Sequence, residues 1–168
     1  GTSTPDPVSL VTVESEVLVA DATLNQVLRF DTSGTYLGSF LKKTGDTGRI
    51  DLPHAAAMAA NGEVWVADSG NHRLSVYSSS GEILRTIGGF GDGDGQFQYP
   101  TSVAIAPDGL VAVTDTSNHR IQILRQDGTF VRTFGKTLNG IADLNFPRQA
   151  VWAADGSIWV VDTSNSCV

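Results

Sequence analysis

The sequence of 168 residues has one cysteine, one methionine, few basic residues and no long apolar run. The single cysteine, Cys167, cannot close an internal disulfide, so cysteine usage does not reveal the redox compartment. No apolar run approaches the roughly 20 residues that cross a bilayer as a helix. Eleven Lys and Arg against eighteen Asp and Glu give a net charge of −7, the wrong sign for gripping phosphate backbones. These absences disfavour a helical membrane protein and a nucleic-acid-binding protein.

The remaining composition is that of a globular, turn-rich chain. Hydrophobic residues make up 40% and charged residues 17%, which excludes wholesale disorder. Eighteen glycines indicate many turns, and no segment shows a convincing helical period. The length suits one domain. A start at Gly1 instead of Met is expected of a processed or excised chain.

A repeat of 47 residues organises the whole sequence. The alternating segments VLVAD, VWVAD, VAVTD and IWVVD end at Asp21, Asp68, Asp115 and Asp162. Each repeat reads as four short strands separated by Gly or Asx turns. A four-stranded unit at this spacing is typical of a β-propeller. The sequence therefore predicts an all-β propeller segment, one domain over 1–168, with blades at 6–52, 53–99 and 100–146 and a partial blade at 147–168.

The segments that follow the strand-end aspartates resemble a known repeat. They read Asn71-His72-Arg73-Leu74 and Asn118-His119-Arg120-Ile121, and a glycine-rich joint, GGFGDGDGQF, precedes Tyr99-Pro100. These features resemble the NHL repeat, and the resemblance extends over essentially the whole chain. The two ends depart from the pattern, with Leu24-Asn25-Gln26 in the first unit and Asn165-Ser166-Cys167 in the fourth. Pro7 also lies one place off the column that Pro53 defines.

The resemblance carries implications for the ring and its axis. Propellers of this family usually close with six blades, so about three and a half blades form an incomplete ring. In the family the first strand of each blade lines the axis, and the small residues at 55–57 suit that crowded centre. We therefore expect four channel-facing strands, at Val8–Glu14, His54–Ala60, Thr101–Pro107 and Arg148–Ala154. Trp65 and Trp159 share one column and are expected to pack between blades.

Most polar residues in the repeat columns are interpreted as structural. Each strand-end aspartate precedes a turn, and the backbone N–H groups of that turn can donate hydrogen bonds to its carboxylate. The predicted structural turn residues are Asp21, Asp68, Asp115, Asp162, Asn71, Asn118 and Asn165. Asp92 and Asp94 lack the ladder of acidic ligands that a calcium loop needs. No metal, cofactor or catalytic residue is predicted. His72 and His119 share a column and are expected on adjacent blades, and no thiol cluster accompanies His54, His72 and His119.

The two ends of the chain are predicted to be open. The last unit stops at the start of a third strand, and Ser166, Cys167 and Val168 are the predicted assembly joint. No preceding blade covers the first blade, whose expected exposed face includes Val11, Val13, Val17, Val19, Val27 and Leu28. Open strand edges and blade faces are liabilities that folded proteins cover or pair. Either a longer chain or further copies of this chain would complete the ring.

Three functions remain open from the sequence. The favoured one is a non-enzymatic structural or protein-interaction module at an extracellular or cell-surface location, with glycan attachment as an option. Its partners would be further copies of itself or additional blades, and self-assembly would follow. The second is a fragment of a propeller enzyme, because NHL-fold lyases and propeller lactonases use metal and histidine sites at the ring centre. The third is RNA binding, through arginine columns such as Arg73 with Arg120 and Arg85 with Arg132.

Overall fold

The computed structural model describes residues 4–13, 15–41, 49–135 and 143–168. The first blade contains β1 (Pro7–Val13), β2 (Glu16–Asp21), β3 (Gln26–Asp31) and β4 (Tyr36–Ser39). The second blade contains β5 (Pro53–Met58), β6 (Val64–Asp68), β7 (Arg73–Tyr77) and β8 (Ile83–Ile87). The third blade contains β9 (Pro100–Ile105), β10 (Val111–Asp115), β11 (Arg120–Leu124) and β12 (Phe130–Phe134). The fourth, partial blade contains β13 (Pro147–Trp152) and β14 (Ile158–Asp162).

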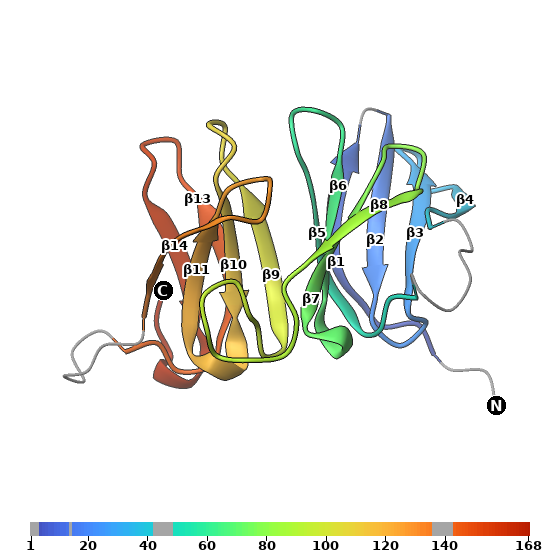
Figure 1. The fold of residues 1–168 in the computed structure, drawn as a ribbon. Helices are drawn as coiled ribbons and strands as arrows, with labels where there is room; N and C mark the ends of the chain where they lie inside the picture. The colour runs from blue at the N-terminus through green and yellow to red at the C-terminus, as the bar shows by residue number, and fades with distance from the viewer. Residues whose placement is uncertain (1–3, 14, 42–48, 136–142) are drawn as a thin grey trace.

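Each blade is one antiparallel sheet whose strands follow the order of the sequence (Figure 1). Three sheets have four strands and the last has two, which confirms the predicted all-β architecture of about three and a half blades. Short 3-10 turns follow the second strand of the last three blades, at Ser69–Asn71, Thr116–Asn118 and Thr163–Asn165. No helix in the described part of the chain is long and apolar enough to cross a membrane.

Tight turns join the strands within a blade. Gly81 sits in the turn before β8 with φ of +81°, and a Cβ at this position would clash with the carbonyl oxygen of Phe40 in the first blade. Only glycine satisfies both the positive φ and this close approach. Glycine at this turn therefore allows the chain to reverse direction and also allows the close packing of the first blade against the second.

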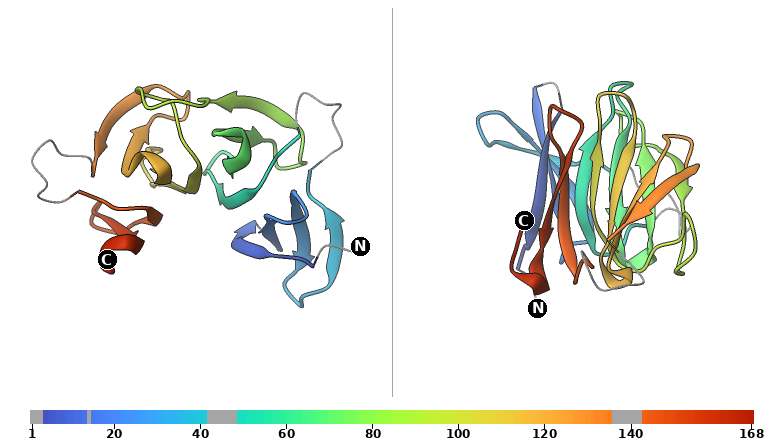
Figure 2. Two further views of the ribbon diagram at one scale, coloured as in Figure 1. Left: turned by 90° about the horizontal axis from the view of Figure 1, so that it is seen from below. Right: turned by 90° about the vertical axis from the view of Figure 1, so that its left-hand side faces the viewer.

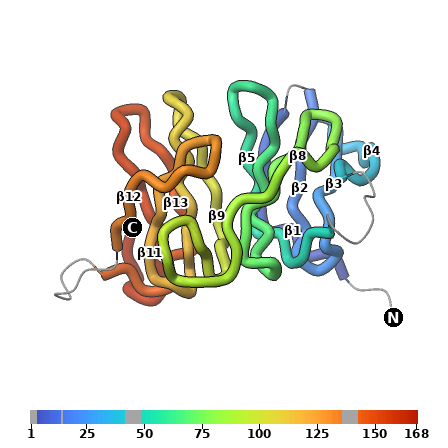
Figure 3. Tube along the Cα trace, in the orientation of Figure 1, coloured from blue at the N-terminus to red at the C-terminus, as the bar shows by residue number. Residues whose placement is uncertain are grey.

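The blades form an open arc with the first strand of each blade on its inner side (Figure 2). These inner strands contact one another from blade to blade, β1 with β5, β5 with β9 and β9 with β13. The chain passes from the outermost strand of one blade to the innermost strand of the next (Figure 3). The strands expected to face the channel therefore lie there. Each begins at its proline and ends before the predicted boundary, and Glu14 lies outside the described residues.

Three apolar clusters fill the junctions between blades. Between the second and third blades, Trp65, Leu74 and Val76 pack with Val111 and Val113. Other clusters join the first blade to the second and the third blade to the fourth. Residues of β6 and β10 are buried on both faces, because a central blade has a neighbour on each side. Most of the core therefore lies between sheets.

The expected exposed face of the first blade needs a correction. Val11, Val13 and Val27 pack toward the second blade, and Val27 is completely buried. Because alternate residues of a strand point to opposite faces, β2 and β3 turn Val17, Val19 and Leu28 to the uncovered side. Leu10, Phe30 and Tyr36 join them there through the pairs Leu10↔Val19, Val17↔Phe30 and Phe30↔Tyr36. The prediction from the sequence therefore grouped residues of two opposite faces of the first blade into one exposed face.

The same blade explains the displaced proline. Pro7 pairs with Asp21 just as Pro53 pairs with Asp68, although Pro7 is one residue closer in sequence to its aspartate. The first hairpin is therefore one residue shorter than its equivalent in the second blade. The shorter hairpin shifts β1 by one place in the 47-residue column, which reverses the assignment of its faces.

Candidate functional site

A buried carboxylate ends the second strand of each blade. Asp68 accepts through Oδ1 from the Asp51 backbone N–H at 2.8 Å and from Asn71 Nδ2 at 2.9 Å. Its Oδ2 accepts from Arg73 Nε at 2.8 Å and from Ser75 Oγ at 2.9 Å. Four donors occupy the roughly four lone-pair positions of an ionised carboxylate. This aspartate therefore ties the turn, the third strand and the inter-blade segment together, and has no position left for a cation.

The third blade repeats this arrangement. Asp115, also completely buried, accepts from the Gln98 backbone N–H at 2.6 Å. Its Oδ2 accepts from Asn118 Nδ2 at 2.8 Å, Arg120 Nε at 2.7 Å and Gln122 Nε2 at 3.2 Å. In both blades the Asn and the Arg of the triplet, Asn71-His72-Arg73 or Asn118-His119-Arg120, thus donate to the strand-end carboxylate of their own blade.

The end blades have fewer donors. In the first blade, Asp21 Oδ1 accepts from the backbone N–H groups of Asp6 and Leu24, while its buried Oδ2 has no partner among the described residues. In the fourth blade, Asp162 accepts from the Asn145 N–H at 2.7 Å and from Asn165 Nδ2 at 2.7 Å. These are the blades whose triplets depart from the repeat.

The histidine of each triplet accepts a hydrogen bond from the segment that leads into the next blade. His72 Nδ1 accepts from the Tyr99 backbone N–H at 3.0 Å, and His119 Nδ1 accepts from the Phe146 N–H at 3.2 Å. Asn25 Oδ1 does the same for the Leu52 N–H at 2.7 Å. Each of the three N–H donors precedes a proline and has a positive φ, between 47° and 59°. Asn25 therefore replaces histidine in the same role.

The third histidine and the glycine-rich joint also have local partners. His54 Nδ1 lies 2.9 Å from the Leu52 carbonyl oxygen and donates to it. In the joint that carries Asp92 and Asp94, the Gly91 oxygen accepts from Asn118 Nδ2 and the Gly93 oxygen accepts from Arg120 Nη2, both at 2.8 Å. No group of three His, Cys, Asp or Glu side chains that could hold a metal occurs within the described residues.

Most arginines of the predicted arginine columns form ion pairs with carboxylates of the fold. Arg73 and Arg120 bind the strand-end aspartates, and Arg120 is buried. Arg85 forms two 2.7 Å hydrogen bonds to Glu63, and its guanidinium lies 5.3 Å from the ring centre of Trp65. The Arg85 hydrogen bonds hold the pKa of the Glu63 carboxyl below its ordinary range. Paired guanidinium groups of this kind do not form a free surface for phosphates.

The outer face of the partial blade is apolar and uncovered. Val151, Trp159 and Val161 are 46%, 57% and 39% exposed. Trp159 occupies the column of Trp65, which is completely buried against the third blade. The same column therefore lies in a junction in the second blade and on the surface in the fourth.

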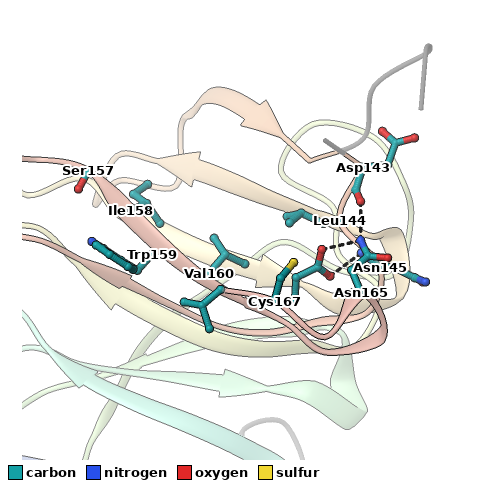
Figure 4. Close-up of a pocket in the computed structure, with 11 residues that line it drawn as sticks. Asp143, Leu144, Asn145, Ser157, Ile158, Trp159, Val160, Asn165 and Cys167 are labelled. Carbon is teal, nitrogen blue, oxygen red and sulfur yellow. Dashed lines mark hydrogen bonds between the residues drawn. The ribbon is translucent and has the colours of Figure 1, made fainter. Parts of the chain in front are cut away.

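Beside this face, a cavity of about 920 Å³ follows the free edge of β14 (Figure 4). Leu144, Ile158 and Val160 contribute its apolar lining, Asp162 also lines it, and Cys167 lies toward one end. Cys167 is exposed and its backbone pairs with Asp162, the N–H of Asp162 donating to the Cys167 oxygen at 2.9 Å. The joint predicted at residues 166–168 therefore borders a cavity. No repeat column or motif indicated Leu144 as part of this cavity.

A second concavity of about 430 Å³ lies where the four inner strands begin. Its lining includes Asp6, His54, Thr101 and Arg148, one residue from each blade. The Thr101 hydroxyl donates to the Arg148 carbonyl oxygen at 2.8 Å. The sequence predicted that His54, Thr101 and Arg148 begin channel-facing strands but assigned them no binding role, and Asp6 lies just before the first of these strands.

Comparison with known proteins agrees with this geometry. A family model of the NHL repeat matches residues 51–77 and 97–124. The chain contains NHL repeats. No match was found among curated proteins.

The similar solved structures are propellers of low sequence identity. An inactive virginiamycin B lyase from Staphylococcus aureus has a TM-score of 0.70 and 15% identity, with 96% of this chain and 50% of that chain covered. A chain of the nidogen/laminin complex gives 0.70 and 20%, covering 93% and 56%. The WD40 β-propeller domain of Doa1 gives 0.66 and 16%, covering 90% and 45%. This NHL-repeat chain thus has the propeller fold and spans about half the length of these structures.

Proposed function

We propose that this NHL-repeat segment is a non-enzymatic protein-interaction module whose open blade faces are covered by further blades of the same kind. The contrast between Trp65, completely buried, and Trp159, 57% exposed in the same column, is the observation that carries the proposal. Burying apolar surface contributes roughly 25 cal/mol per Å². A blade that covered Trp159 would bury apolar surface and so stabilise the junction, as the third blade does by covering Trp65.

The opposite end of the arc supports the same proposal. Leu10 and Tyr36 are 67% and 56% exposed on the uncovered face of the first blade. The residues equivalent to Val17 and Val19 in the second blade are Val64 and Val66, which are completely buried against the first blade. The two ends therefore present the two halves of one repeated junction.

The partners we propose are copies of this chain or additional blades of a longer one. Two complementary ends on one molecule make a head-to-tail contact, which closes into a ring or extends as a filament. The structure from the nidogen/laminin complex is a propeller found in a protein complex, which favours a protein partner. An extracellular or cell-surface location remains part of this proposal.

Light scattering at increasing protein concentration tests the module. We expect the average mass to rise above that of the monomer, and Trp159→Lys to abolish the rise because a charge then lies in the contact. Leu84→Lys is the matched control, since Leu84 is 50% exposed on β8 of an internal blade. A cooperatively melting monomer at all concentrations would contradict self-association.

A fragment of a propeller enzyme is the alternative, and one observation favours it. The concavity at the inner strands carries Asp6, His54 and Arg148, side chains able to bind a polar ligand. Stoichiometric metal in the purified chain, measured by elemental analysis, would support this alternative over the interaction module.

A further inference from the structure

Two of the three histidines accept hydrogen bonds at the junctions between blades. His72 Nδ1 accepts from the Tyr99 backbone N–H at 3.0 Å, and His119 Nδ1 accepts from the Phe146 backbone N–H at 3.2 Å. A backbone N–H can only donate, so Nδ1 carries a lone pair and no proton in both rings. Both histidines therefore make these bonds only as neutral imidazoles.

A protonated imidazole cannot make the same bonds. An imidazolium carries a proton on each ring nitrogen and has no acceptor, whichever way the ring is turned. Protonation of His72 or His119 would place an N–H group against the backbone N–H that now donates to the ring. Histidine changes its charge between about pH 5 and 8. Mild acid therefore removes the acceptor from both junctions.

The rings around the two histidines restrict their movement. Phe90 and Tyr99 pack edge-on against the His72 ring, with ring centres 5.1 Å and 6.1 Å away. Phe146 packs in the same way against the His119 ring at 4.4 Å. Each imidazole is thus held beside its donor, so that it cannot turn toward another partner when it gains a proton.

Charged groups near the two rings do not pair with them. The strand-end aspartates of both blades are bound to the arginines of their own triplets, and the ion pairs formed among the described residues involve neither histidine. Exposed carboxylates of Asp92 and Asp94 lie in the joint that carries Phe90. Other titratable or charged side chains on the neighbouring segments are Asp51, His54 and Tyr99 near His72, and Asp143, Arg148 and Asp162 near His119.

The remaining junction and the remaining histidine do not have this sensitivity. Between the first and second blades, Asn25 Oδ1 accepts from the Leu52 backbone N–H at 2.7 Å, and an amide oxygen keeps its lone pairs in mild acid. His54 Nδ1 donates to the Leu52 carbonyl oxygen at 2.9 Å, and this donor persists when the ring gains a second proton. The chain therefore contains its own reference junction.

We infer that the junctions on both sides of the third blade open in mild acid through protonation of His72 and His119, whereas the junction between the first and second blades stays closed. Tyr99 and Phe146 have φ of 59° and 49°, a costly conformation that the surrounding structure must support. Loss of the imidazole acceptor removes one such support. Both junctions lie inside the chain, so their pH response does not depend on the proposed protein partner.

The stability of these two junctions falls as the pH falls. An opened junction can bind a proton on its histidine, whereas the closed junction keeps that ring neutral. The closed state is therefore favoured above about pH 6.5, where an ordinary imidazole is neutral, and it opens up to about tenfold more readily for each pH unit below that value.

Hydrogen exchange at three backbone amides of the full chain, corrected for the intrinsic exchange rate at each pH, provides the test. Between neutral pH and about pH 5, we expect the protection of the Tyr99 and Phe146 amides to fall by about tenfold or more, and that of the Leu52 amide to change little. His72→Asn should make the protection of Tyr99 independent of pH, because an amide oxygen then accepts the bond, and should leave the loss at Phe146. His119→Asn should do the reverse.

His54→Asn is the matched control, because it removes a titrating ring that donates instead of accepting. It should retain the acid-induced loss at both Tyr99 and Phe146. Unchanged protection of these two amides near pH 5 would overturn the inference. An equal loss at Leu52 would also overturn it, since the whole chain would then unfold in acid, and so would a loss at Tyr99 that persists in His72→Asn.

Discussion

At the scale of single residues, each triplet side chain has a hydrogen-bond partner that explains its place in the repeat. The Asn and the Arg donate to the strand-end carboxylate, and the His accepts from the next blade. The sequence identified these columns because they recur. It could not reveal that the His bonds to a backbone N–H 27 residues away, since a hydrogen bond between blades leaves no local pattern.

Replacing His72 tests this joint. His72→Asn should leave the free energy of unfolding nearly unchanged, because Asn25 accepts the equivalent bond in the first blade. His72→Ala should lower it by about 1–3 kcal/mol, because the Tyr99 N–H then lacks its acceptor. Urea unfolding measures the loss, and hydrogen exchange at the Tyr99 amide separates it from backbone strain. Equal protection of that amide in both variants would contradict the assignment.

The buried hydroxyl of Tyr77 makes stability depend on alkaline pH. Tyr77 is 2% exposed and its hydroxyl has no hydrogen-bond partner among the described residues. Burial, with the negative charge of Asp68 as a smaller cause, raises the pKa of Tyr77 to about 12. Because the unfolded chain ionises first, at about pH 10, the stability present below that pH is lost as pH rises toward 12.

Tyr77→Phe should remove this alkaline loss. It should also raise the free energy of unfolding at neutral pH by on the order of 1 kcal/mol, because it deletes an unsatisfied buried hydroxyl. Urea unfolding at neutral pH and near pH 11 measures both effects. Tyr36→Phe is the control, since Tyr36 is 56% exposed and should change neither quantity. An unchanged alkaline limb in Tyr77→Phe would assign the loss to another group.

At the scale of strands, alternation and turn residues were sufficient to predict every strand of the three complete blades. The prediction failed where a one-residue difference changes the face. Val11 and Val13 were grouped with Val17 and Val19, but the shorter hairpin after β1 places the two pairs on opposite sides. The strand-end aspartates keep their spacing across this shift, and its sign in the sequence is Pro7, which lies one place off its column.

The crowding of the inner strands can be tested at Ala57 on β5. Ala57 packs against the cluster between the second and third blades, whereas Ser79 is exposed in a turn. Ala57→Phe should lower the free energy of unfolding by about 1–3 kcal/mol through overpacking, and Ser79→Phe should have little effect. Thermal unfolding of both variants provides the measurement. Equal melting temperatures would argue against an inner position of β5.

At the scale of the whole molecule, the sequence predicted the number of blades and the existence of open ends. It could not predict the cavity beside β14, because Leu144 and Val160 approach each other only through the packing of the third blade on the fourth. It predicted that the strands lining the inner concavity face the axis, but it did not predict a concavity there, because the lining residues come from four separate repeats. The shape of a site made between repeats is not recorded in any single repeat.

Stability should decrease from the middle of the arc toward its ends. All five residues of β6 and of β10 are buried, whereas only Asp162 is buried in β14. In a repeat array each unit is stabilised by its neighbours, so a blade with one neighbour opens more easily than a blade with two. Hydrogen exchange should therefore be slowest in β6 and β10 and fastest in β14, with β2 between them. Trp65→Ala should accelerate exchange across both central blades, because it leaves a cavity in their shared junction, and Trp159→Ala should leave them unchanged. Uniform exchange over all four blades would mean that the arc unfolds as one cooperative unit and that its open ends do not weaken it.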